Sequence, residues 1–140
     1  MSTTNAKSDY LEQKFIEAAL KNTSFAGGAT LYVALFTAVS SGETPSVTEV
    51  TGGSYARQAI AASGGWSSGG QVSGAYEVSN ASAITFPTAT ADWGDITHFG
   101  IYDASTSGHL FYFAQLDTLK TINTGDTFEF ATGTLKVNEA

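Results

Sequence analysis

One stretch of the chain, near its N-terminus, carries apolar residues at the spacing of an α-helix. Leu11 and Phe15, four residues apart, begin an apolar face that continues toward the end of the stretch. Ser8 or Asp9 precedes this face and is suited to cap the first turn. The pattern predicts a helix over residues 8–21.

The first seven residues show no such pattern. They are polar and lack the apolar run of a secretory signal, so we expect none to be present. Residues 1–7 are predicted to form a flexible arm, and residues 8–140 a single domain that includes the helix.

Beyond the helix, the hydrophobic period changes to two. The strand predicted over residues 30–37 has Leu31 and Val33 on one face and Tyr32 and Phe36 on the other. Since both faces are apolar, we expect both to be covered. The N-terminal helix and a partner subunit are the two candidates for the second cover. Because two-fold dimers are the commonest closed assembly, we expect a homodimer.

The rest of the chain reads as short strands separated by turn residues, which favours a β-sandwich or barrel. A polar loop over residues 38–53 contains Pro45 and is longer than a simple connection needs. About eight strands fit the pattern, so we predict a mainly β fold, a jelly-roll-like antiparallel β-sandwich of two four-stranded sheets. The further strands are predicted over residues 54–62, 71–79, 83–86, 96–102, 109–116, 127–131 and 134–137.

Composition narrows the possible functions. The 140 residues include no cysteine, so thiol chemistry and Cys-based metal sites are excluded. The net charge is −7, which disfavours binding to nucleic acid. No apolar run approaches the length of a membrane span, so we expect no membrane partner.

Three sequence features resemble catalytic motifs, and in each case we favour a structural interpretation. Gly65-Trp66-Ser67-Ser68-Gly69 matches the nucleophile pattern of a hydrolase, but no helix is predicted after it. His98 and His109 are too few for a metal site. Asp92 and Asp95 flank Trp93 in a predicted turn, where Asp92 or Asp95 is expected to bond nearby backbone amides. We therefore predict no catalytic residue, cofactor or metal.

The single arginine and the two tryptophans are distinctive. Arg57 either pairs with a carboxylate across the sheet or anchors an interface. Trp93 is expected to fill one end of the core. Trp66, among glycines and serines, is expected in an exposed turn.

Several stretches together resemble a family of small tailed-phage virion proteins. They are residues 88–104, residues 49–58, the strand over residues 31–37 and Tyr10-Leu11-Glu12, and the resemblance extends from about residue 9 to residue 137. Members of the family are labelled tail-fibre proteins or capsid decoration proteins. In size and pattern the chain is also similar to jelly-roll cement proteins that sit as dimers on phage capsids.

The resemblance implies a capsid cement protein that binds the major capsid protein on the capsid exterior, after assembly in the host cytoplasm. The alternative is a tail-fibre protein that contacts a receptor or carbohydrate, with Trp66, Trp93 and the tyrosines as a platform. A hydrolase is the third class, and it depends only on the Ser67 motif. For a virion protein of either kind, the residues predicted to contact a partner are Arg57, Tyr32, Phe36, Glu49 and Pro45.

Overall fold

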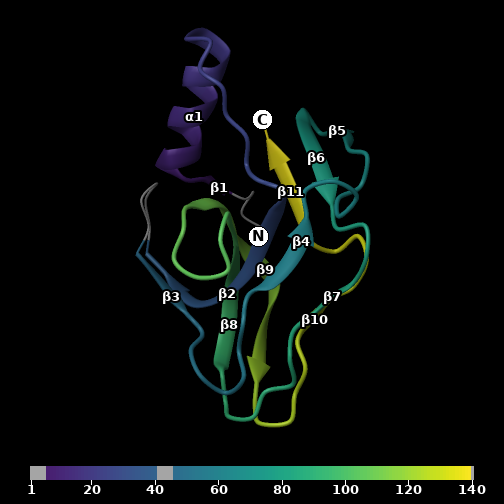
Figure 1. The fold of residues 1–140 in the computed structure, drawn as a ribbon. Coiled ribbons are helices and arrows are strands. Elements are labelled where there is room, and N and C mark those ends of the chain that lie inside the picture. Colours follow the sequence, from purple (N-terminus) through teal and green to yellow (C-terminus); the bar gives the residue numbers. More distant parts are fainter. Residues whose placement is uncertain (1–5, 41–45, 140) are drawn as a thin grey trace.

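The computed structural model describes residues 6–40 and 46–139. Within these residues the chain forms one helix and eleven strands (Figure 1). The elements are β1 (Ala6–Lys7), α1 (Asp9–Leu20), β2 (Thr30–Val39), β3 (Val47–Glu49), β4 (Gln58–Ala61), β5 (Gly70–Val72), β6 (Ala75–Ser79), β7 (Ile84–Thr85), β8 (Gly94–Tyr102), β9 (Leu110–Ile122), β10 (Glu129–Phe130) and β11 (Lys136–Glu139).

The strands form three antiparallel sheets. The largest has the order β1-β9-β8-β2-β3, and β4 also pairs with β2. A three-stranded sheet, β11-β6-β5, and a two-stranded sheet, β10-β7, complete the set. The predicted antiparallel β-sandwich is thus confirmed, but the strands divide into sheets of six, three and two rather than four and four. The jelly-roll connectivity stays a prediction.

The main core lies between the large sheet and the two smaller ones. Val33 and Leu35 of β2 and Ile101 of β8 contribute to it from the large sheet, and each is at most 1% exposed. Toward one end the core becomes aromatic. There the rings of Phe86, Phe99, Phe128 and Phe130 meet mostly edge to face, an arrangement that aromatic quadrupoles favour.

The opposite face of β2 forms a second, smaller core. Ala34 and Phe36 are completely buried there together with Tyr102 and Phe113. A Cβ at Gly100 would lie 2.6 Å from the Phe36 ring, so only glycine leaves that ring its place. The chain covers this face itself, and α1 contacts β9 and β1 instead. Our expectation that the helix or a partner covers this face is wrong for Ala34 and Phe36.

Hairpins correct two of the predictions, one of a loop and one of a strand. The loop predicted over residues 38–53 contains β3, which forms a hairpin with β2. The single strand predicted over residues 71–79 is a hairpin of β5 and β6, with Ser73 and Gly74 both at positive φ (49° and 86°). This is the backbone of a tight two-residue hairpin turn, and Gly74 supplies it without steric cost.

The strand predicted over residues 54–62 is shorter than expected. Gly52, Gly53 and Ser54 all have positive φ, and the turn they form delays the ladder until β4 begins at Gln58. A period-two pattern alone does not show this delay, because the pattern continues through a turn.

The N-terminal helix agrees with its prediction. The Ser8 side chain caps it by accepting a hydrogen bond from the Leu11 backbone N–H at 3.3 Å. The segment before it differs from the predicted arm at its last two residues. Ala6 and Lys7 form β1 against β9, and Lys7 pairs with Glu139.

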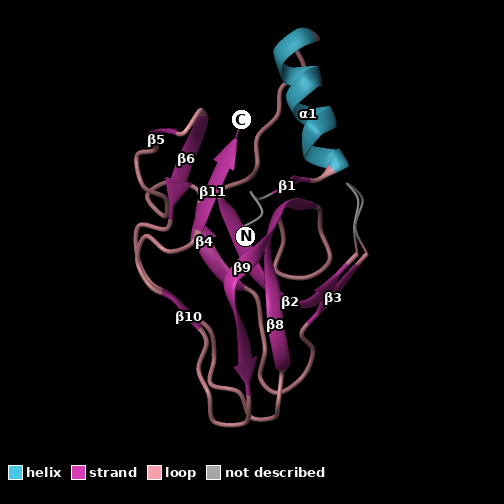
Figure 2. Ribbon diagram, turned by 180° about the vertical axis from the view of Figure 1, so that it is seen from behind, coloured by secondary structure: helices cyan, strands magenta, loops and turns pink. Residues whose placement is uncertain are grey.

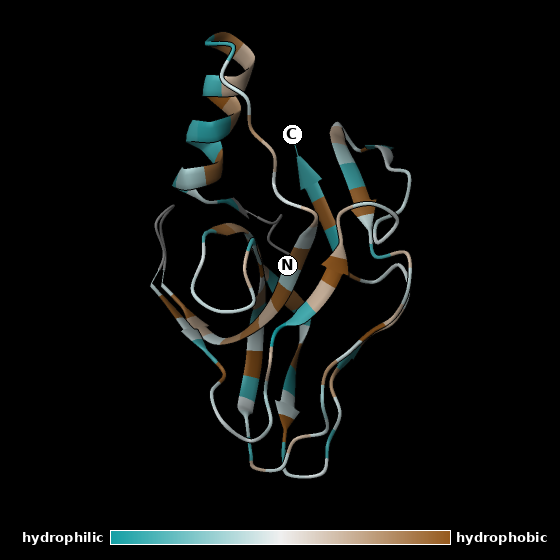
Figure 3. Cartoon of the chain, in the orientation of Figure 1, coloured by the Kyte–Doolittle hydropathy of each residue, from teal (hydrophilic) through white to brown (hydrophobic). Residues whose placement is uncertain are grey.

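Helix α1 projects from the sandwich, beside the C-terminal end of β11 (Figure 2). Leu11 is its one buried residue, whereas Ile16 is 57% exposed and Leu20 76% exposed. Figure 3 shows hydrophobic residues at the outer end of the helix. No helix within the described residues is long and apolar enough to span a membrane.

The two tryptophans differ in burial in the expected order. Trp93 is 6% exposed, and its indole N–H donates to the Gly53 carbonyl at 2.9 Å. Trp66 is half-buried rather than exposed, since it packs against the edge of the main core and bridges to Asn80.

Replacing the more buried tryptophan is expected to cost more stability. Trp93→Ala should lower the free energy of unfolding by about 3–5 kcal/mol, because it leaves a cavity in the core. Trp66→Ala should lower it by distinctly less. Urea unfolding followed by circular dichroism measures both, and equal losses in the two variants would contradict the assignment.

Candidate functional site

The predicted partner-contacting residues Glu49 and Arg57 form an ion pair within the chain. Glu49 ends β3, and Arg57 directly precedes β4. The guanidinium donates from Nε to Glu49 Oε2 and from Nη2 to Glu49 Oε1, each at 2.9 Å. This is the bidentate geometry that a guanidinium and a carboxylate favour.

Arg57 also fastens the loop between β8 and β9. Its Nη1 donates to the carbonyls of Ala104 (2.9 Å) and Ser107 (2.8 Å). Its guanidinium carbon lies 3.7 Å from the centre of the Tyr102 ring, a cation–π contact. The Arg57 side chain is only 7% exposed. Of the two alternatives for Arg57, the structure displays the pairing with a carboxylate, and a contact with a partner stays a prediction.

Tyr55 extends this network into the main core. Its hydroxyl donates to Glu49 Oε2 at 2.6 Å and accepts from the Leu35 backbone N–H at 3.0 Å. Burial, together with the hydrogen bond to Glu49, raises the pKa of Tyr55 far above its ordinary value. Burial also raises the pKa of Tyr102. For Arg57, burial opposes the charge, but the bonds to Glu49 outweigh it and raise the pKa. Arg57 therefore keeps its charge, and Tyr55 and Tyr102 keep their protons, over the ordinary pH range.

Sequence reasoning missed Tyr55 and Tyr102 as members of this network. The sequence offered one signal. Tyr55 and Arg57 are two residues apart, which is the spacing of side chains on the same face of a strand. Their shared partner, Glu49, comes from a hairpin that the hydrophobic pattern did not predict.

The other predicted partner-contacting residues lie in different surroundings. Phe36 is completely buried in a cluster with Tyr102 and Phe113 of the same chain. Our prediction that it needs a cover from outside the chain is therefore wrong. Tyr32 lies on the same face of β2, opposite Tyr102, and is half-buried. Pro45 lies outside the described residues.

The residues considered for catalysis are scattered. His98 bonds to the Thr97 hydroxyl, and His109 bonds to Asp103, so the two histidines serve separate neighbours. The described residues contain no group of three or more acidic or histidine side chains that would hold a metal.

The other two sequence motifs make structural hydrogen bonds, Asp92 just before strand β8 and Asp95 within it. Asp92 accepts a hydrogen bond from the Thr124 backbone N–H at 2.8 Å, while Asp95 accepts one from the Thr121 hydroxyl. Ser67 exchanges hydrogen bonds with the backbone of Ser79, and strand β5 follows it. The geometry thus matches the structural interpretation of both motifs.

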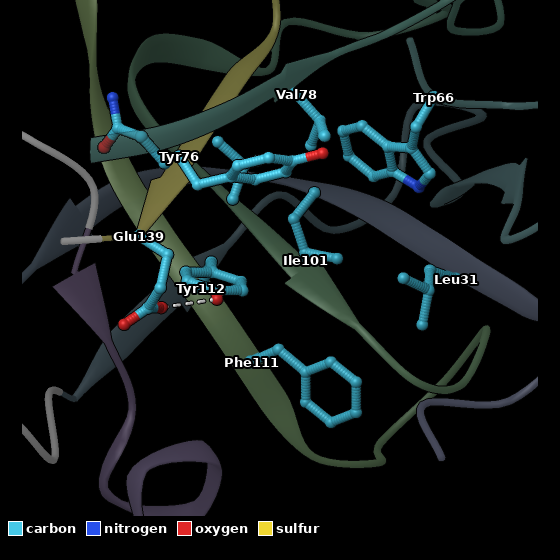
Figure 4. A pocket seen from close by; sticks show the side chains of 10 residues that line it. Leu31, Trp66, Tyr76, Val78, Ile101, Phe111, Tyr112 and Glu139 are labelled. Carbon is cyan, nitrogen blue, oxygen red and sulfur yellow. Dashed lines mark hydrogen bonds between the residues drawn. The ribbon is translucent and has the colours of Figure 1, made fainter. Parts of the chain in front are cut away.

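A cavity of about 300 Å³ opens between the large sheet and the β11-β6-β5 sheet (Figure 4). We refer to it as the aromatic hollow. Its inner wall is formed by Leu31, Val78, Ile101, Phe111 and Val137.

Aromatic and polar side chains complete the aromatic hollow. They are Trp66, Tyr76, Tyr112, Asn138 and Glu139. In Figure 4 the Tyr76 hydroxyl points toward Trp66, and Glu139 lies beside Tyr112. The Tyr112 hydroxyl donates to Glu139 Oε1 at 2.8 Å. Burial, followed by this bond, raises the pKa of Tyr112. No sequence pattern brought these five residues together, because they come from segments far apart in the chain.

Breaking the Arg57–Glu49 pair is expected to destabilise the fold. Arg57→Ala and Glu49→Ala should each lower the free energy of unfolding by about 3 kcal/mol, because each leaves a largely buried group without its partner. The double variant should lose much less than the sum. Urea unfolding of the four proteins measures this, and strictly additive losses would show that the pair contributes nothing to folding.

A pH dependence follows from His98. Burial lowers the pKa of its imidazole, so the folded chain binds fewer protons there than the unfolded chain below about pH 6.5. The free energy of unfolding should therefore fall as the pH is lowered from about 7.5 to about 5.5. His98→Gln should flatten this slope, and Gln115→Ala, which changes its cross-strand neighbour, should keep it. Thermal unfolding across this range is the measurement, and an unchanged slope in His98→Gln would contradict the assignment.

Comparison with known proteins identifies the family of the chain. No curated protein matches the chain. A family model described as "Podophage GP4 fiber I protein gp80" matches residues 6–138, nearly the whole chain. The protein is a phage virion structural protein, and it belongs to the podophage GP4 fiber I protein gp80 family.

Proposed function

We propose that the chain is a structural subunit of a phage fibre, which functions through contacts with neighbouring virion proteins. The observation that supports this most directly is the family match over residues 6–138, because the family is described as a fiber protein. The geometry is compatible with that role, since the described residues contain no group of three or more acidic or histidine side chains that would hold a metal, and the Ser67 hydroxyl accepts from the backbone of Ser79. A virion subunit needs surfaces rather than an active site.

Helix α1 offers the clearest surface for such a contact. Ile16 and Leu20, one helical turn apart, are the largest exposed apolar side chains of a helix that stands away from the sandwich. Residues four apart lie on the same helical face, so the two form one apolar stripe. We propose that a neighbouring virion subunit covers this stripe.

The second candidate function is that of a capsid cement protein, and the support for it is the sequence resemblance. In this role the chain binds the major capsid protein on the capsid exterior, through residues 1–7, the segment 38–53 and Arg57. Its net charge of −7 would keep decorated particles apart. The Arg57 network bears on this role, because an outside carboxylate would compete with Glu49. A homodimer remains a prediction for either role.

The position and copy number of the protein in the virion distinguish these candidates. A cryo-EM map of the virion, with the domain fitted into it, should place the protein at the tail in a few to tens of copies. Hundreds of copies on the capsid shell would overturn the fibre assignment and establish the cement protein. Absence from the particle would contradict both.

The helix contact is tested by placing a charge in the apolar stripe. Ile16→Glu and Leu20→Glu should leave the domain folded, because both side chains are largely exposed, and should reduce incorporation into virions at least about tenfold. Leu119→Glu is the matched control, since Leu119 is 51% exposed on β9, away from the helix. Quantitative mass spectrometry of particles from a complemented deletion phage measures incorporation. Normal incorporation of both helix variants would exclude α1 as the contact.

A further inference from the structure

We propose that two copies of this chain associate through the end of the sandwich from which α1 projects, with the apolar stripe of each copy inserted into the aromatic hollow of the other. This inference rests on the proposed function and deepens it. It names a second copy of the chain as the neighbouring subunit that covers Ile16 and Leu20, and it names the surface that receives them.

The aromatic hollow is suited to an apolar side chain of a protein. Its inner wall is aliphatic and aromatic, and the hydroxyls of both tyrosines that line it already have partners within the chain (Figure 4). The Tyr112 hydroxyl donates to Glu139, and the Tyr76 hydroxyl donates to the Ser68 carbonyl at 3.1 Å. An apolar side chain can therefore enter without depriving these hydroxyls of their hydrogen bonds.

The apolar stripe has the size and the exposure that such an occupant needs. Ile16 and Leu20 are 57% and 76% exposed, so covering them removes apolar surface from water, which is favourable. The hollow measures about 300 Å³, which is at the lower end for ligand sites. It thus has room for one or two aliphatic side chains at the tip of a helix but not for a whole helix.

The stripe reaches the hollow of another copy more readily than its own. The base of α1 borders the hollow of its own chain, because the Tyr10 ring stacks at 6.0 Å on Phe111, which lines that hollow. Helix α1 has 12 residues and is about 18 Å long, and its outer end stands away from the sandwich (Figure 2). Neither Ile16 nor Leu20 lines the hollow of its own chain.

The position of the two surfaces favours a second copy over an unrelated partner. The stripe and the hollow lie at the same end of the molecule, so a two-fold axis at this end allows both insertions to form at once. Such an interface uses the same surface on both subunits and closes on itself. Of the five large exposed apolar side chains in the described residues, four belong to α1 and the β5–β6 hairpin at this end: Ile16, Leu20, Val72 and Tyr76.

Charge also favours a second copy. Residues 14–21, which carry the stripe, contain two lysines and one glutamate, so their formal charge is +1 in a chain whose net charge is −7. The one charged residue among the described residues that line the hollow is acidic, Glu139. The outer half of α1 is thus positive, and a second copy is an acidic molecule that attracts it.

Sedimentation equilibrium of the intact chain tests the association. Because each insertion involves only one or two side chains, the interface is small, and we expect a reversible dimer with a dissociation constant of about 100 µM. Ile16→Glu and Leu20→Glu should each raise this constant at least about tenfold. Leu119→Glu is the matched control, since Leu119 is an exposed leucine away from α1, and it should leave the constant unchanged. Circular dichroism shows whether each variant is folded.

A charge rescue tests which surfaces meet. Tyr76→Lys places a cation at the opening of the hollow and should weaken self-association as Leu20→Glu does. Mixing these two variants should restore dimers, because one insertion then brings a glutamate to a lysine and the other insertion is native. Mixing Leu20→Glu with Tyr76→Glu should restore distinctly less. The rescue separates a contact between copies from a loss of folding, since a misfolded variant is not rescued by its partner.

Cross-linking provides a covalent test, because the chain contains no cysteine of its own. Isotopically labelled Leu20→Cys is mixed with unlabelled Tyr76→Cys and treated with a short bis-maleimide reagent. Mass spectrometry should find more mixed dimers than dimers of either variant alone. Leu20→Cys mixed with Leu119→Cys should show no such excess.

Two results would overturn the inference. The first is a wild-type chain that stays monomeric up to about ten times the expected dissociation constant. The second is an association that the stripe and hollow variants leave intact, since this would place the interface elsewhere. If copies do not associate while Ile16→Glu and Leu20→Glu still lower incorporation into virions, another virion protein covers the stripe. In that case this inference fails and the proposed function stands.

Discussion

Strand β2 is buried on both of its faces, and much of the remaining structure serves to achieve this. Val33 and Leu35 point into the main core, while Ala34 and Phe36 point the other way and are equally inaccessible. The main core of the sandwich covers the face that carries Val33 and Leu35. Covering the other requires the β3 hairpin and the first residues of β9, which bring Val47 and Leu110 against it.

The Arg57 network holds this second cover in place. The guanidinium joins the end of β3 through Glu49, the β8–β9 loop through two carbonyls, and the ring of Tyr102 that packs on Phe36. One side chain thereby joins two segments that are far apart in sequence, β3 and the end of β8 with the loop that follows it. An ion pair in this position gives the loops a defined arrangement, even where its net contribution to stability is modest.

The two ends of the sandwich differ, and this difference bears on function. Trp93 and the bonds of Asp92 close one end. At the other end, α1 and the β5–β6 hairpin stand apart on either side of the C-terminal strand (Figures 1 and 2). The exposed apolar side chains Ile16, Leu20, Val72 and Tyr76 belong to these two elements, and the aromatic hollow lies below them. The end that is open to contact is thus also the end that carries the candidate binding surfaces of this virion protein.

The sequence by itself determined the features that depend on neighbours along the chain. The helix and its Ser8 cap, the double apolar character of β2, the turn around Asp92 and the class of fold all follow from local periodicity and turn chemistry. The resemblance carried by residues 88–104 and 49–58 also indicated a phage virion protein, in agreement with the family match.

Tertiary structure alone decided which segments meet. Glu49 became the partner of Arg57 because β3 pairs with β2, and a three-residue strand is too short to show a period. Phe36 is covered from within the chain because Tyr102 and Phe113 reach it across the sheet. The aromatic hollow combines residues between Leu31 and Glu139. Such sites are set by strand register and sheet packing, which depend on the whole chain, and no local pattern encodes them.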